Sequence, residues 1–105
     1  MDRNRRTHPR LKTSVPVEIN VEGSNSPHRG ATSDLSLTGC YIETTFPWPV
    51  GTNLDMKLQL DETLLVMATV VTCDGLVGNG IEFTKMLPED IEELRSFLEA
   101  AEKSE

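Results

Sequence analysis

Apolar and polar residues alternate along much of the chain, which is the pattern of half-buried β-strands. The clearest example covers residues 54–60, which read Leu-Asp-Met-Lys-Leu-Gln-Leu. Residues 64–73 form a nearly continuous apolar and β-branched run, which is typical of a central strand. With weaker segments included, the pattern predicts strands at residues 15–21, 28–34, 39–45, 54–60, 64–73 and 80–84.

The segments between these strands carry turn residues. Residues 23–27 read Gly-Ser-Asn-Ser-Pro, and residues 46–51 contain two prolines, so neither stretch is expected to be regular structure. Asp74-Gly75 is a turn signal at the start of a loop longer than a tight hairpin.

The apolar period changes at Pro88. Proline in a first turn, followed by the acidic pair Glu89-Asp90, is typical of a helix start. Beyond it, an apolar stripe at helical spacing comprises Ile91, Leu94, Phe97, Leu98 and Ala101. Strands at roughly ten-residue spacing followed by one helix predict a mainly β protein, an antiparallel barrel whose helix closes the mouth or side of the sheet.

Charge is distributed unevenly along this single expected domain of 105 residues. Residues 1–12 hold five basic residues against Asp2, a net charge of +4, so the other 93 residues carry −11 of the total of −7. We therefore divide the chain into a basic N-terminal arm (1–12), the barrel (13–86) and the C-terminal helix (87–103). An acidic body argues against DNA or RNA as a partner, because phosphate-backbone binding needs a wide basic face. A short basic arm suits a small anion such as a dinucleotide.

Other functional classes find little support in the sequence. Cys40 and Cys73 lie in strand-like stretches, form no CxxC pair and are expected to be buried thiols, so no metal cofactor is expected. No apolar run is long enough for membrane insertion, and the polar N-terminus has no signal-peptide core, so we expect a cytoplasmic protein. Both histidines lie in polar segments and no catalytic order emerges, so we expect no enzyme.

Two polar motifs stand out from this background. Residues 34–39 read Asp-Leu-Ser-Leu-Thr-Gly; on an extended backbone, Asp34 and Ser36 would share a polar face opposite the two leucines. The plain alternative is a turn, which Asp and Ser favour. Residues 6–10 read Arg-Thr-His-Pro-Arg, and the plain alternative for them is a solvated basic tail.

Taken together, the two motifs resemble those of the PilZ family, an RxxxR followed along the chain by [D/N]xSxxG. Arg6 to Arg10 fits the first motif, Asp34 to Gly39 fits the second, and Gly78 to Phe83 resembles a looser GxGxxF-like strand. The resemblance implies a six-stranded β-barrel that binds the bacterial second messenger cyclic di-GMP.

The resemblance also implies roles for residues of the arm. Arg6 and Arg10 would bind the Hoogsteen edge of a guanine and the phosphates, because the planar guanidinium matches both groups. Arg5, which precedes the first motif arginine, would add a further contact.

On the barrel side, the resemblance implies that Asp34 and Ser36 hold a guanine. An ionised carboxylate accepts hydrogen bonds from the guanine N1–H and N2–H donors, which arginine cannot do. Gly39 would permit close approach of the ligand.

The expected function is therefore a non-catalytic cyclic di-GMP receptor or adaptor, monomeric or dimerising with ligand. Its mobile arm would fold over the ligand and change the interaction with a protein effector. The alternative is a degenerate PilZ domain that has lost the ligand and serves as a protein–protein interaction module. Both readings need no cofactor other than the ligand.

Overall fold

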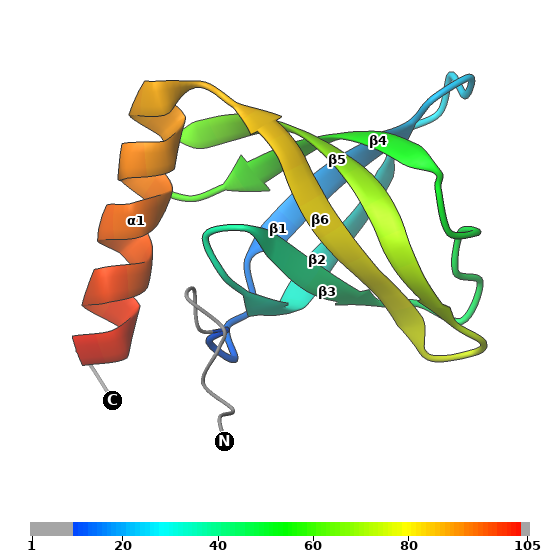
Figure 1. Ribbon diagram of the computed structural model, residues 1–105, viewed down its shortest axis with the longest axis horizontal. Coiled ribbons are helices and arrows are strands. Elements are labelled where there is room, and N and C mark those ends of the chain that lie inside the picture. Colours follow the sequence, from blue (N-terminus) through cyan, green and yellow to red (C-terminus); the bar gives the residue numbers. More distant parts are fainter. Residues whose placement is uncertain (1–9, 104–105) are drawn as a thin grey trace.

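Six antiparallel strands close into a barrel, and one helix lies across one of its ends (Figure 1). The structure is a computed structural model and describes residues 10–103. Its strands are β1 (Pro16–Val21), β2 (His28–Leu35), β3 (Gly39–Glu43), β4 (Asn53–Gln59), β5 (Thr63–Asp74) and β6 (Gly78–Met86), followed by the helix α1 (Pro88–Lys103). The predicted fold, a six-stranded antiparallel barrel with a C-terminal helix, is confirmed.

The barrel consists of two three-stranded meanders in the order β1-β2-β3-β6-β5-β4. Strand β3 pairs with β6, and β4 closes the barrel by pairing with β1. Every strand therefore has two neighbours, and the sheet has no free edge. The β2–β3 and β4–β5 turns lie at the end of the barrel that α1 covers, and loop 44–52 lies at the opposite end (Figure 1).

Alternate residues of each strand fill the barrel, as the period of two requires. In β4, Leu54, Met56 and Leu58 point inward and are almost completely buried. The outward-facing apolar residues of β5 are a surprise, because Leu65 and Met67 are each more than half exposed. The continuous apolar run of β5 thus places apolar residues on both faces of the strand, one buried in the barrel and the other facing solvent.

Helix α1 packs its apolar stripe against the barrel end. Leu94 is fully buried, and Phe97 and Leu98 pack against the core. The helix start is held to β5, because the backbone N–H of Leu65 donates to a carboxylate oxygen of Asp90 at 3.4 Å. No helix in residues 10–103 has the length and apolar character needed to span a membrane.

The two cysteines differ in their surroundings. Cys40 is buried in the core, as expected, but Cys73 near the end of β5 is exposed. The expectation of a buried thiol is therefore wrong for Cys73. The reason is that the last four residues of β5, residues 71–74, are all exposed to solvent.

Candidate functional site

An irregularity in β2 brings Asp34 to the outer surface of the barrel. Thr32 pairs with Ile42 and Asp34 pairs with Tyr41, so β2 contains one residue more than β3 over this interval. Thr32 and Leu35 both point inward and are buried, whereas Ser33 and Asp34 between them are partly exposed. Regular alternation from Thr32 would have turned Asp34 into the core, so this β-bulge creates the exposed carboxylate.

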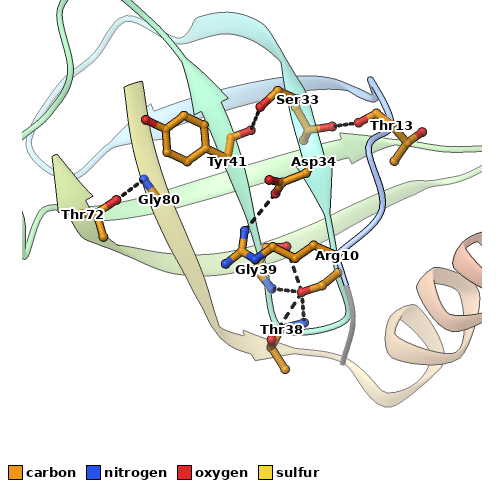
Figure 2. Close-up of polar contacts among 11 residues, drawn as sticks. Arg10, Thr13, Ser33, Asp34, Thr38, Gly39, Tyr41, Thr72 and Gly80 are labelled. Atoms are coloured by element: carbon orange, nitrogen blue, oxygen red, sulfur yellow. Dashed lines mark hydrogen bonds and ion pairs between the residues drawn. The ribbon is translucent and has the colours of Figure 1, made fainter. Parts of the chain in front are cut away.

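Arg10 reaches this carboxylate from the end of the N-terminal arm. Its Nη1 donates to Oδ1 of Asp34 at 2.9 Å, and both side chains remain about one-third exposed (31% and 28%; Figure 2). The backbone places the arginine there, because Leu11 and Leu35 exchange N–H···O hydrogen bonds of 2.9 Å each way. The structure thus joins two motifs that are 24 residues apart in sequence.

Ser36 lies in the turn that follows β2 and is buried. Its Oγ accepts hydrogen bonds from the backbone N–H groups of Thr38 (3.1 Å) and Gly39 (3.2 Å). The sequence left two alternatives, an extended polar face shared with Asp34 or a turn, and the structure has the turn, because the chain turns immediately after Leu35. In this structure the hydroxyl stabilises the β2–β3 turn.

Gly39 begins β3 directly against the backbone of β6. A Cβ at this position would collide with the carbonyl oxygen of Ile81. The glycine is therefore required by the close approach of the two strands. The contact of Gly39 with a ligand stays a prediction, as does that of Ser36.

The carboxylate of Asp34 influences two neighbouring groups. The pKa of the Cys40 thiol is raised to about 12, mainly by burial and also by the charge of Asp34, while the charge of Arg10 partly opposes the shift. The pKa of Tyr41 is also raised to about 12, first because its hydroxyl donates to Asp74 at 2.6 Å, with Asp34 as a smaller contributor. The Cys40 thiol and the Tyr41 hydroxyl therefore both stay protonated at neutral pH.

Tyr41 is a neighbour of the site that the sequence did not single out. It is the cross-strand partner of Asp34, and only the bulged register of β2 puts the two side by side. Alternation within residues 39–45 indicated the side of the strand on which Tyr41 lies, but not the residue opposite it. Arg5 and Arg6, the other two predicted ligand contacts, lie outside the described residues.

Within residues 10–103, no three His, Cys, Asp or Glu side chains are grouped so that they could hold a metal ion. The polar groups at the site are a guanidinium, a carboxylate and backbone amides. Such groups are suited to binding a ligand that carries both acceptors and donors.

Comparison with solved structures finds the same fold. The structure of the Bacillus subtilis inhibitor of motility (MotI/DgrA) matches with a TM-score of 0.83 at 16% identity over 96% of this chain. This chain spans only about half, 52%, of that one. The PilZ domain of YcgR from Escherichia coli, solved with c-di-GMP, matches with a TM-score of 0.75 at 15% identity, covering 95% of this chain and 93% of that chain.

A third structure, the PilZ domain of CeSA from a cellulose-synthesizing bacterium, has a TM-score of 0.69 at 21% identity and covers 90% of this chain and 98% of that one. No curated protein matches the sequence. The sequence profile described as "PilZ domain" matches residues 4–100, which include the arm motif, the β2–β3 motif and most of α1. The chain therefore belongs to the PilZ domain family.

Proposed function

We propose that this protein is a non-catalytic receptor for cyclic di-GMP. The observation that carries the proposal is the ion pair between Arg10 and Asp34, which joins the two motifs on the outer surface of the barrel. The YcgR PilZ domain, which has this fold, was solved with c-di-GMP. The chemistry of the two side chains is complementary to guanine and phosphate.

Each side chain has a distinct role in the proposal. The guanidinium of Arg10 donates to the O6 and N7 acceptors of a guanine or to a phosphate. The carboxylate of Asp34 accepts from the guanine N1–H and N2–H groups. Arg10 donates to Oδ1 of Asp34, and within residues 10–103 no donor is bonded to Oδ2. In the proposal, Oδ2 accepts from the base.

The remaining motif residues complete the site. Arg5 and Arg6 of the arm bind the phosphates or the second guanine, and Ser36 and Gly39 form the turn on which the base rests. Because the arm folds over the ligand, binding changes its conformation and passes the signal to a protein effector. Cyclic di-GMP is an intracellular messenger, so the proposal places the protein in the cytoplasm.

Isothermal titration calorimetry with cyclic di-GMP tests the proposal. We expect saturable binding by the wild type, no binding of GTP, and loss of binding in Arg10→Ala and Asp34→Ala. Arg29→Ala is the matched control, because Arg29 is also an exposed arginine near a carboxylate, 3.7 Å from Glu18, and belongs to neither motif. A folded wild type that releases no heat with cyclic di-GMP would refute the receptor and favour the interaction module.

A further inference from the structure

A row of four residues crosses the outer face of the barrel next to the Arg10–Asp34 pair. Asp34 on β2 pairs with Tyr41 on β3, Tyr41 pairs with Gly80 on β6, and Gly80 pairs with Thr72 on β5. Figure 2 shows Asp34, Tyr41, Gly80 and Thr72 following one another across the sheet. Within this row, Tyr41 is the only large side chain.

The Tyr41 ring is held in one place before any ligand arrives. Its hydroxyl donates to Oδ2 of Asp74 at 2.6 Å, so the side chain extends from β3 across β6 to β5. The ring passes over Gly78, where a Cβ would lie 2.8 Å from the ring carbon Cε2. A hydrogen bond at the far end therefore fixes an aromatic ring that remains partly exposed.

Beside the ring, the β6 strand is contacted at Gly80 by the side chain of Thr72. Gly80 has no side chain, and its backbone N–H donates to Oγ1 of Thr72 at 2.9 Å. A Cβ on residue 80 would lie only 2.5 Å from Thr72 Oγ1, so the threonine side chain fills the space beside the glycine. The row thus consists of a carboxylate, a fixed ring, a glycine and a threonine whose hydroxyl accepts from the glycine N–H.

A structural role alone would explain part of this arrangement, because an aromatic ring laid across glycines protects their backbone and fixes strand register. A base held by its donor edge at Asp34 that lies over the neighbouring strand β3, however, would meet the Tyr41 side chain first. A ring fixed in advance loses little conformational freedom on binding, and stacking on aromatic rings is a sequence-tolerant way to hold a base.

We propose that Tyr41 is a further ligand-contacting residue, whose ring forms the side wall of the site for the guanine held by Asp34. This inference rests on the proposed binding of cyclic di-GMP. Asp74 is then a positioning residue, which acts by fixing the ring.

NMR on the wild-type protein gives a direct test, because Tyr41 is the only tyrosine in the chain. With ring-labelled tyrosine, a single set of aromatic signals reports this side chain. We expect these signals to shift on saturation with cyclic di-GMP and to remain unchanged with GTP. Ring signals that stay in place while the backbone amides of Asp34 and Gly39 shift would overturn the proposal.

Calorimetry of two variants adds the energetic test. Tyr41→Leu removes the flat ring but still covers the glycines, and we expect it to weaken binding by about tenfold or more. Tyr41→Phe keeps the ring and loses only its bond to Asp74, so we expect a loss of about threefold. Wild-type affinity in a folded Tyr41→Leu protein would contradict the role of the ring.

The outcomes separate this inference from the function on which it rests. If the wild type shows no binding heat, the receptor itself fails and the Tyr41 proposal fails with it. If the wild type binds and neither the ring signals nor the Tyr41→Leu affinity change, only the Tyr41 proposal fails. The NMR measurement on the wild type remains decisive even if Tyr41→Leu does not fold.

Discussion

The side-chain amide of Asn79 bonds both backbone groups of Trp48. Oδ1 of Asn79 accepts from the Trp48 N–H at 2.9 Å, and Nδ2 donates to the Trp48 carbonyl at 2.9 Å and to the Thr72 carbonyl at 3.1 Å. Asn79 is fully buried. One side chain of β6 thus hydrogen-bonds the backbone of loop 44–52 as the backbone of a neighbouring strand would.

Replacing Asn79 with leucine should destabilise the protein. The three backbone groups would lose their partners, and we expect the free energy of unfolding to fall by about 2 kcal/mol or more. Urea denaturation followed by fluorescence measures this directly, because Trp48 is the only tryptophan. Asn79→Asp keeps the acceptor but sets a carboxylate against two carbonyls, so it should be at least as unstable at neutral pH and partly recover in acid. An Asn79→Leu protein with wild-type stability would contradict the role of the amide.

Breaking the Arg10–Asp34 pair should affect ligand binding far more than folding. Both side chains are partly solvated, and such pairs contribute about 1 kcal/mol or less to stability. Arg10→Ala and Asp34→Ala should therefore unfold at nearly the wild-type urea concentration. Gly39→Ala is the contrasting variant, because its Cβ meets the backbone of β6 and should lower stability clearly. If Arg10→Ala unfolds as readily as Gly39→Ala, its loss of ligand binding is no sign of a direct contact.

Tyr41 should ionise at a higher pH than an ordinary tyrosine. The bond to Asp74 raises the pKa of Tyr41 to about 12, against an ordinary value of 10.0. The protonated phenol is favoured in the folded state, so the stabilisation is fully present below pH 10 and is lost as pH rises toward 12. An absorbance titration of tyrosinate checks this, and Asp74→Asn should lower the pKa. Equal titration curves for the two proteins would show that the hydrogen bond is not made in solution.

The two cysteines should differ sharply in reactivity. The thiolate is the reactive form, and burial raises the pKa of the Cys40 thiol to about 12, whereas Cys73 is exposed. A thiol reagent at neutral pH should therefore label one site in the folded protein and both in denaturant. Cys73→Ser should leave the folded protein unlabelled, and rapid labelling of that variant would mean that the core around Cys40 opens readily.

Leu76 in the β5–β6 loop adopts a left-handed backbone conformation with φ of 63°. A residue with a bulky side chain is strained in this conformation. The Leu76 side chain is 77% exposed, so its packing contributes little stability to offset the strain. Leu76→Gly should raise the free energy of unfolding by up to about 1 kcal/mol. The adjacent Val77 is also exposed but has no positive φ, so Val77→Gly should destabilise. Thermal denaturation of the two variants should therefore give melting temperatures that move in opposite directions.

The fold was predictable from sequence because most strands obey a period of two with little interruption. Residues 54–60 alternate without exception, and β4 covers Asn53–Gln59. The helix likewise begins at Pro88, where the apolar period changes. Strand β2 gave the weakest signal, because its bulge breaks the alternation between Thr32 and Leu35.

The site was predictable in its residue types but not in its geometry. The two motifs identified Arg10 and Asp34, which the structure brings into contact. The burial of Ser36 and the position of Tyr41 beside Asp34 both depend on where β2 bulges and turns. Those features are set by the packing of Leu35 and by hydrogen bonds such as that from Ser36 N–H to the Gly39 carbonyl, which no residue spacing reveals.

The bulge at Ser33 separates the placement of the motif aspartate from the exact length of β2. Deleting Ser33 would leave both motifs, RxxxR and DxSxxG, intact in the sequence. Counted from Thr32, regular alternation would then leave Asp34 outside and Leu35 inside, as they are now, so the bulge accommodates one extra residue without moving either side chain to the other face. A single-codon deletion upstream of the motif would thus leave the carboxylate on the outer face beside Tyr41, in a strand that is one residue shorter.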